Sequence, residues 1–588
     1  MVIGGPAAAV RRGRVGRVLR AAAGTIVILA AGCGSTVSPA PAGSPDSTPA
    51  SAPSAGDASG GGPAPTCPPI PPLAPPVDSL DRPGWWRGRV FAEIFVRSYA
   101  DDNGDGVGDL AGLRAKLDYL HDGDPTTTAD LGVTGLWLMP TFPSPSYHGY
   151  DVTDYRGVNP DYGSLADLRA LVAAAHERGI AVLLDLPLNH TSAQHPWFVG
   201  SRTGTGPYAH WYVWSDAPQG SNWHPDGSRY FYANFGPDLP DLNLANPAVT
   251  AEVSADAEFW LTDVGVDGFR LDAAKHLIED GATLENTPET HAWWRSFRSA
   301  VEAKAPGALL LGEVWDTPQI SSSYVPDDLD LTFDFALASI DVSAAQSGDG
   351  GSVGRALDTI TRLYPAAGGF GAFLTNHDQD RVATQLKGDA GALRVAADLL
   401  LLGPGVPFVY YGEEIGLTGA KPDERIRTPM RWDDSTPAAG FSTHAPWAAL
   451  SDDPASVNVA SESADPGSLL SRYRDLIRLR TDHPAIATGS WLAVESTAPG
   501  LVAALRIAPG ETALVVTNVG SSAVAAPALT LARGPLCGNP VASLVFGSGQ
   551  AAGPSVTPSG GFAGYQPLTT IAPRSSVVIV LGTSGAVQ

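Results

Sequence analysis

Short apolar runs alternate with amphipathic stretches along the chain from Arg89 to about Glu414. Eight of these runs are almost continuously apolar, which is typical of strands buried on both faces of a parallel sheet. They occupy residues 89–99, 133–140, 180–190, 266–273, 308–315, 329–335, 371–378 and 405–414. Eight such strands joined by helices favour a closed barrel over an open sheet. We therefore predict an α/β fold of the (β/α)8 class over residues 81–484.

The segments between the runs carry the apolar period of helices. In residues 164–179, Ser164 and Asp167 have the spacing of a capping box and Gly179 is placed to end the helix. About 50 residues rich in aromatics and turns, 191–243, separate the third and fourth runs. This is too long for a simple loop and predicts a small inserted domain after strand 3. After Pro484 short strands are broken by Gly, Pro and Ser, which predicts an antiparallel β-sandwich over residues 485–588.

The first 80 residues lack this pattern. A region with five arginines precedes an apolar run from Ala21 to Cys33 that is too short to span a bilayer, so residues 1–32 are predicted to be a signal peptide. The run ends in LAAGC, which resembles the lipobox of bacterial lipoproteins and implies lipidation of Cys33. Cleavage by an ordinary signal peptidase is the alternative. Residues 33–80, dominated by Pro, Ser, Ala and Gly, predict a disordered tether. The predicted location is extracellular, on the outer face of the cell membrane.

Charge and cysteine content narrow the picture further. The formal net charge is −24, and an acidic surface repels phosphate backbones. This argues against nucleic acid as a partner and suits a neutral substrate such as a sugar, and the sequence indicates no protein partner. Two further cysteines, Cys67 and Cys537, either pair in an oxidising compartment or both stay unpaired; the sequence leaves this open.

The polar residues that suggest chemistry fall at the carboxyl ends of the predicted strands. They are Asp185, Asn189, His190, Arg270, Asp272, Glu313, His377 and Asp378. In a (β/α)8 barrel these ends share one mouth, whereas chance would scatter such residues over loops and helices. The convergence therefore predicts an active site that contains three acids from three strand ends.

Two of these acids suit the cleavage of a glycosidic bond, which needs a pair of carboxyl groups. Asp272 lies two residues after Arg270, so both side chains face the same way on a strand. We expect the guanidinium to lower the pKa of Asp272 and keep it ionised, as a nucleophile requires. Glu313 lies among apolar residues, which would raise its pKa and suit a general acid. A buried ion pair without catalytic function is the alternative for Arg270 and Asp272 taken alone.

Four segments, DLPLNH, GFRLDAAKH, GEVW and FLTNHDQDR, resemble in order the catalytic signatures of glycoside hydrolase family thirteen, the α-amylase family, and LPDLN (239–243) resembles its fifth. The resemblance implies Asp272 as nucleophile, Glu313 as acid/base and Asp378 as a third acid that grips ring hydroxyls. It also implies a set of residues around the sugar at the cleavage point. This set comprises Tyr150, Asp185, His190, Arg270 and His377.

Two departures within the family refine the predicted substrate. His148 stands where members that remove single glucose units often carry an acid, and Lys275 and His276 resemble the residues of α-1,4-acting amylases that bind the leaving-side sugar. Both favour internal α-1,4 cleavage. LPDLN lies closer to oligosaccharide-acting members, and together these features resemble an intermediate group that contains lipid-anchored α-amylases. An α-glucosidase or a transglycosylase, including trehalose- or sucrose-converting relatives, is the alternative, and a non-catalytic glucan-binding lipoprotein is a remote one.

The segment DDNGDGVGD, directly after the first predicted strand, indicates a metal loop. Oxygen donors at alternate positions separated by glycines can wrap a hard cation, and relatives in the family carry calcium in this loop. The expected ligands are Asp101, Asn103, Asp105, the Val107 carbonyl and Asp109. An acidic, glycine-rich solvated loop is the alternative. A second calcium near Asn189 and the His276 carbonyl is a weaker expectation.

Overall fold

The computed structural model describes residues 84–365 and 369–582. Cys33, Cys67, the signal peptide and the tether lie outside these residues, so the predictions about them are not tested. In the part described, no helix is both long and apolar enough to cross a bilayer.

Eight parallel strands close into a barrel in the order β1-β11-β10-β9-β8-β7-β3-β2. The strands are β1 (Phe91–Ile94), β2 (Gly135–Leu138), β3 (Ala181–Leu186), β7 (Gly268–Leu271), β8 (Leu309–Gly312), β9 (Leu331–Phe333), β10 (Gly369–Ala372) and β11 (Val406–Tyr410). Seven lie within one of the eight apolar runs and β10 overlaps the start of its run by two residues, so the predicted (β/α)8 barrel is confirmed. Phe91, Trp137, Leu183, Leu309 and Phe408 belong to one buried cluster that fills the barrel, as the continuous apolarity of the runs requires.

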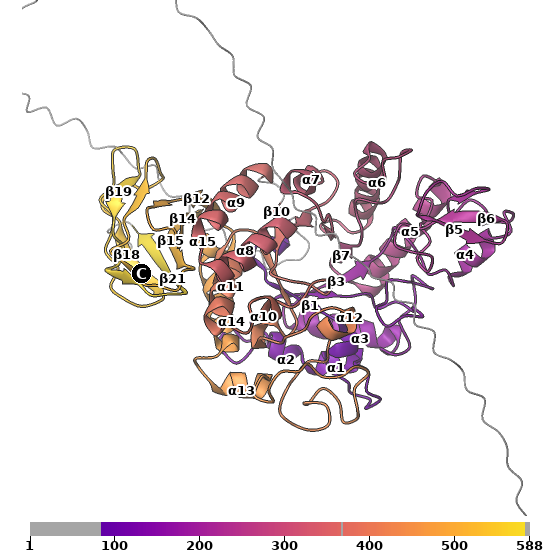
Figure 1. Ribbon diagram of the computed structural model, residues 1–588, viewed down its shortest axis with the longest axis horizontal. Helices are drawn as coiled ribbons and strands as arrows, with labels where there is room; N and C mark the ends of the chain where they lie inside the picture. Colours follow the sequence, from indigo (N-terminus) through magenta and orange to yellow (C-terminus); the bar gives the residue numbers. More distant parts are fainter. Residues whose placement is uncertain (1–83, 366–368, 583–588) are drawn as a thin grey trace, which may run out of the picture. The chain divides into compact units, whose positions relative to one another are not determined.

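Helices connect the strands and cover the barrel (Figure 1). The longer ones are α3 (Leu165–Glu177), α5 (Pro247–Glu258), α6 (Pro288–Lys304), α8 (Phe335–Ser347), α9 (Gly350–Leu363), α11 (Ala390–Leu402) and α14 (Leu469–Asp482). The short ones are α1 (Leu110–Ala115), α2 (Leu117–Leu120), α4 (Pro196–Ser201), α7 (Pro318–Ser323), α10 (Val382–Gln385), α12 (Asp423–Ile426), α13 (Val459–Ala464) and α15 (Pro484–Ala487). Helix α3 begins with the predicted capping box, in which Ser164 and Asp167 each accept a hydrogen bond from the other's backbone amide.

A small group of elements is inserted between β3 and α5, as expected. It contains α4 and an antiparallel sheet in the order β4-β6-β5, seen together in Figure 1. The strands are β4 (Trp214–Ser215), β5 (Trp223–Asp226) and β6 (Arg229–Tyr232). Phe198, Tyr212 and Phe231 are buried there with their rings in contact, and they join the same buried cluster as residues of the barrel.

The chain ends in antiparallel sheets. One has the order β12-β14-β15-β21-β18 and another β13-β17-β19, with a short β16-β20 pair beside them. The strands are β12 (Ser490–Ala493), β13 (Glu495–Ser496), β14 (Leu501–Ala508), β15 (Glu511–Asn518), β16 (Val524–Ala525), β17 (Leu529–Leu531), β18 (Val541–Phe546), β19 (Phe562–Tyr565), β20 (Thr570–Ile571) and β21 (Ser575–Gly582). Leu505 and Ile579 of the first sheet share a buried cluster with Leu529 and Phe562 of the second, which is the core of the predicted sandwich.

Buried arginines link these sheets to the barrel helices. Arg506 of β14 donates hydrogen bonds to the carbonyls of Leu402, at the end of α11, and of Ile486 and Gly489 at distances of 2.6, 2.9 and 3.0 Å. Carbonyls at the carboxyl end of a helix lack partners within the helix and carry partial negative charge. A guanidinium with several donors therefore satisfies them at a joint where water has no access.

Candidate active site

A cavity of about 530 Å³ lies at the carboxyl ends of the barrel strands and is lined by all three predicted acids, Asp272, Glu313 and Asp378. Its other lining residues are His148, Tyr150, His190, Phe235, Leu239, Ala273, Lys275, His276, Trp315, Asp423 and Arg427. Most of the substrate-binding residues predicted from the sequence are thus brought together. Asp185, Arg270 and His377 do not line the cavity; they are buried directly behind it.

Arg270 joins three of the predicted acids. Its Nη1 lies 2.9 Å from Asp185 and 2.7 Å from Asp272, and its Nη2 lies 2.8 Å from Glu313. The guanidinium is 1% exposed and Asp185 is fully buried, whereas Asp272 and Glu313 keep partly exposed side chains that face the cavity. One fixed cation therefore orients both carboxylates at the cavity wall.

The backbone around Asp272 brings β7 close to β8. Gly268 begins β7 with φ +152°, and a Cβ at this position would lie 2.2 Å from the Leu309 carbonyl oxygen, so only glycine fits. Ala273, which follows Asp272, has the left-handed φ of +48°, and its amide donates a 3.1 Å hydrogen bond to Glu313 Oε2. An alanine in this conformation is strained, and such strain is typical of functional sites. The strained turn thus points an amide at the predicted acid/base.

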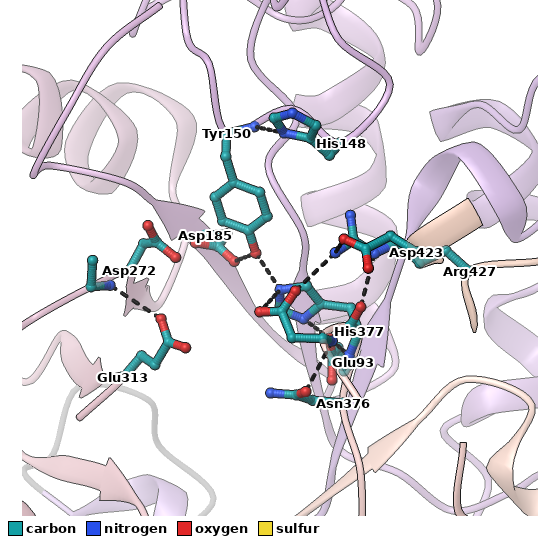
Figure 2. Close-up of polar contacts among 12 residues, drawn as sticks. Glu93, His148, Tyr150, Asp185, Asp272, Glu313, Asn376, His377, Asp423 and Arg427 are labelled. Carbon is teal, nitrogen blue, oxygen red and sulfur yellow. Dashed lines mark hydrogen bonds and ion pairs between the residues drawn. The ribbon is translucent and has the colours of Figure 1, made fainter. Parts of the chain in front are cut away.

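A second chain of contacts holds Asp378. Figure 2 shows the Tyr150 phenol pointing toward Asp185 and His377; its oxygen lies 2.9 Å from Asp185 Oδ2 and 2.7 Å from His377 Nε2. On its other side His377 Nδ1 lies 2.5 Å from Glu93 Oε1. Asp378 lies 3.3 Å from His377 Nε2 and 2.9 Å from Arg427 Nη2. Both neighbours of Asp378 are thus cationic or able to become so.

Burial and neighbouring charges shift the pKa values of the three acids in different directions. Burial raises the pKa of Asp272 to about 6, even though Arg270 opposes the shift. Burial also raises the pKa of Glu313, and Arg270 again opposes the shift. For Asp378 burial is outweighed by His377 and Arg427, and the pKa is lowered. The expected net lowering of the Asp272 pKa is wrong. Arg270 does lower this pKa, but desolvation of the buried carboxylate and the charges of Asp185 and Asp378 raise it by more.

The remaining predicted residues lie around the rim of the cavity. His148 Nδ1 accepts a 3.1 Å hydrogen bond from the Tyr150 amide, and its ring stacks on Tyr150. His190 is buried, and burial lowers its pKa to about 4, so it is neutral near pH 7. Lys275 Nζ is held by Glu285 at 2.8 Å and by the Trp315 carbonyl at 3.0 Å. His276 Nδ1 lies 3.2 Å from the Leu284 carbonyl. The predicted roles of Lys275 and His276 toward a leaving-side sugar stay predictions.

The predicted metal loop follows β1 and is folded back on itself. Asp101 Oδ1 and Oδ2 accept the amides of Gly104 and Gly106 at 2.7 and 2.8 Å. Asp109 Oδ2 accepts the amides of Asp102 and Asn103 at 3.1 and 3.2 Å. Asn103 and Asp105 accept amides two residues further on, from Asp105 and Val107. The side-chain oxygen atoms that were predicted to bind the metal thus all lie in a single tight loop.

Several functional residues were not identified from the sequence. Glu93 in β1 contacts His377, which is 284 residues away, and Trp137 in β2 donates from Nε1 to Asp185 at 3.2 Å. Phe235 and Trp315, 46% and 48% exposed, line the cavity with partly exposed aromatic rings. Arg427 contacts Asp378. The one available signal was polarity: Glu93 is the one acid in the mostly apolar run 89–99.

Comparison with known proteins shows to which family the chain belongs. The family profile "Alpha amylase, catalytic domain" matches residues 93–489. α-Amylase 3 of Dictyoglomus thermophilum is 39% identical over 443 residues, 74% of this chain and 85% of that protein. The trehalose synthase/amylase TreS of Mycolicibacterium smegmatis is 34% identical over 491 residues, 72% and 80% of the two chains. The crystal structure of the α-amylase from H. orenii matches with a TM-score of 0.71 and 37% identity, over 84% of this chain and 99% of that one. The chain therefore belongs to the α-amylase family, glycoside hydrolase family thirteen, and is a glycoside hydrolase.

Proposed function

We propose that the chain is a retaining, endo-acting α-glucan hydrolase that cleaves α-1,4 bonds in starch-like polymers and maltooligosaccharides. The observation that carries the proposal is Arg270, whose two terminal nitrogens bind Asp272 and Glu313 at one wall of the cavity. A retaining glycosidase needs its two carboxyl groups about 5–5.5 Å apart, on either side of one bond. Two carboxylates that share one guanidinium suit this requirement.

In the proposed reaction the Asp272 carboxylate attacks the anomeric carbon while Glu313 donates its proton to the departing glycosidic oxygen. A covalent glycosyl ester on Asp272 results. Glu313, now ionised, takes a proton from water, and the resulting hydroxide displaces Asp272 from the anomeric carbon. The raised pKa of Glu313 favours the protonated acid, and a pKa of about 6 leaves Asp272 mostly ionised near pH 7. Asp378, held ionised by His377 and Arg427, would accept hydrogen bonds from ring hydroxyls.

Internal cleavage is supported by a second cavity that extends the site. A space of about 340 Å³ is lined by Ser146, Asp151, Gln194 and Asp238 and shares His148, Phe235 and Leu239 with the catalytic cavity. Continuous space beyond one sugar ring suits a chain of several glucose units. Together with His148, which stands in place of an acid, these features support assignment of the chain to the intermediate group of the family that includes lipid-anchored α-amylases.

Transfer of glucose to another sugar, or action on short oligosaccharides, is the second candidate. The relative from Mycolicibacterium smegmatis is named as both a trehalose synthase and an amylase, and LPDLN (239–243) favours oligosaccharide-acting members. All these activities share the glycosyl ester. An α-glucosidase differs from the first candidate in the position of cleavage, and a transglycosylase differs in what displaces Asp272. Water gives hydrolysis, and a sugar hydroxyl gives transfer.

Parallel digestion of amylose, pullulan and maltotriose, with products separated by chromatography, tests the proposal. Internal α-1,4 cleavage gives a ladder of maltooligosaccharides from amylose at early times. Glucose as the only early product would indicate an exo-acting α-glucosidase. Products longer than the maltotriose supplied, or trehalose from maltose, would favour the transglycosylase.

Calcium is part of the proposal. The loop donors Asp101, Asn103, Asp105 and Asp109, with the Val107 carbonyl, are all hard oxygen atoms, which is the donor set that calcium prefers. Bound there, the ion would stabilise the loop after β1. A second calcium is supported by Asn189, whose buried Oδ1 has no hydrogen-bond partner in the described part of the chain, while its amide donates to buried Asp241 at 3.0 Å.

We also propose that the enzyme is anchored to the outer face of the cell membrane through a lipid on Cys33. The LAAGC sequence and the arginine-rich region before it support this. Wild-type protein should sediment with membranes after expression in a lipoprotein-processing host, and Cys33→Ser should not. Equal release of both proteins into the medium would contradict the anchor.

A further inference from the structure

A further cavity, of about 460 Å³, lies between the inserted domain and the segment after His276, and none of the three acids lines it. We call it the insert cavity. One wall comes from β5, β6 and the residues that flank them, and the other from residues 277–284. The lining residues that bear on its function are Asn222, Trp223, Tyr232, Asn243, Glu279 and Leu284.

The insert cavity combines the groups that bind sugars. Trp223 keeps part of its ring exposed and meets the Tyr232 ring at a centroid distance of 5.7 Å, so two aromatic rings lie together in the wall. Amide side chains from Asn222 and Asn243 and the Glu279 carboxylate are next to them. A glucose unit packs its apolar face on an aromatic ring and presents hydroxyls at its edge to amides and carboxylates.

Two buried polar atoms of this cavity lack an ordinary partner. Tyr232 is only 5% exposed, and its hydroxyl lies near Asn222 and Glu279 without making a hydrogen bond of ordinary geometry within the described residues. Glu279 Oε1 is likewise buried without such a bond. Buried polar atoms in folded proteins nearly always have partners. The phenol and the carboxylate lie beside one another and form a polar group in the cavity wall to which a ligand hydroxyl can bond.

The insert cavity adjoins the catalytic cavity through one continuous segment. Lys275 and His276 line the catalytic cavity, and the residues immediately after them line the insert cavity. The segment is braced across its turn, because His276 Nδ1 contacts the Leu284 carbonyl at 3.2 Å and Lys275 contacts Glu285 at 2.8 Å. Leu284, which lines the insert cavity, thus lies next to His276, which lines the catalytic cavity.

We propose that the insert cavity binds the leaving-side portion of a long α-glucan, beyond the glucose units held next to the catalytic acids. The inference rests on the proposed function, because it takes Lys275 and His276 as the leaving side. It identifies the preferred substrate as a chain longer than maltotriose, with part of the binding energy supplied by the inserted domain.

The test compares a short and a long substrate in Trp223→Ala. We expect kcat/KM for maltoheptaose to fall roughly tenfold, the loss of one aromatic stacking contact, while kcat/KM for maltotriose stays within about twofold. Trp223→Phe keeps a ring and should retain most of the activity on maltoheptaose. Tyr232→Phe, which removes only the hydroxyl, should also lower kcat/KM for maltoheptaose more than kcat/KM for maltotriose.

Three results would overturn the inference. They are an unchanged kcat/KM for maltoheptaose in Trp223→Ala, an equal loss on both substrates, and a Trp223→Phe variant as impaired as Trp223→Ala. Thermal melts of each variant identify a folding defect, which would act on both substrates alike. Failure of the proposed function is distinguishable, because the wild-type enzyme would then release glucose as the only early product from amylose, whatever the Trp223 variants do.

Discussion

Replacing Glu93 with glutamine should shift the alkaline limit of activity toward lower pH. Burial alone would lower the pKa of His377, but the charges of Asp378 and Glu93 raise it above its ordinary value. His377 is therefore protonated to a higher pH than a free histidine. Glutamine keeps a hydrogen bond to Nδ1 and removes the charge, so the imidazolium is lost at a lower pH.

The magnitude follows from the contact. His377 and Glu93 are 0% and 2% exposed and their atoms are 2.5 Å apart, so the bond is a buried, charge-assisted one. Such bonds contribute about 1.5–3 kcal/mol, against about 0.5–1.5 kcal/mol for neutral ones. The difference, about 1–2 kcal/mol, corresponds to a shift of roughly one pH unit. Between the old and new limits kcat/KM should fall about tenfold, and well below both limits it should change little.

The assay is kcat/KM on maltoheptaose from pH 5 to pH 10, with a thermal melt at each pH. Glu413→Gln is a control for the removal of a buried carboxyl, and it is compared below pH 8, because burial raises the pKa of Glu413 to about 8 and the carboxyl ionises above that pH. Glu413 accepts a hydrogen bond from Tyr473 and does not line the catalytic cavity, so its variant should keep the wild-type pH profile below pH 8. An unchanged alkaline limit in Glu93→Gln would refute the reasoning, as would a uniform loss at every pH.

Three further predictions concern the acids and the metal loop. Asp272→Asn and Glu313→Gln should fold and lose at least about three orders of magnitude in kcat, and near-normal turnover in either would contradict the assignment. Because the pKa of Asp272 is raised to about 6, its carboxyl favours the folded state only while protonated, and that stability is lost as the pH rises through 6. In thermal melts Asp272→Asn should therefore gain about 2–3 kcal/mol over wild type at pH 8 and nothing at pH 4; equal melts at pH 8 would count against burial as the cause. Chelation of calcium should lower the melting temperature of the wild type, and a melt that does not move would argue for a solvated loop.

The barrel was predictable because its signals are local. Each strand is a run of apolar residues, and the start of α3 is specified by two residues three positions apart. The three acids were predictable for a related reason, since the carboxyl ends of parallel strands meet in one mouth whatever the loops do. Position along a strand was enough to bring Asp272 and Glu313 together.

The supports behind the acids were not predictable, because they depend on distance in space. Glu93 and His377, or Arg427 and Asp378, meet only after the barrel has closed. The predicted direction of the Asp272 pKa shift was wrong for the same reason: the sequence shows the neighbouring arginine but not how deeply the pair is buried. The insert cavity also depends on how the inserted sheet packs against residues 277–284, for which no short-range pattern exists.

The carbonyl contacts of Arg506 affect how this enzyme can be engineered. Deleting the C-terminal sheets would expose the last turn of α11 and remove the Arg506 donor from the Leu402 carbonyl, immediately before β11 enters the barrel. A truncated catalytic domain would therefore be expected to melt from that corner and to aggregate. A chimera that borrows the sheets of a relative would need an arginine at the position of Arg506 and matching ends on α11 and α15. The C-terminal sheets and the helix ends that they contact, on α11 and α15, are best exchanged together as one unit.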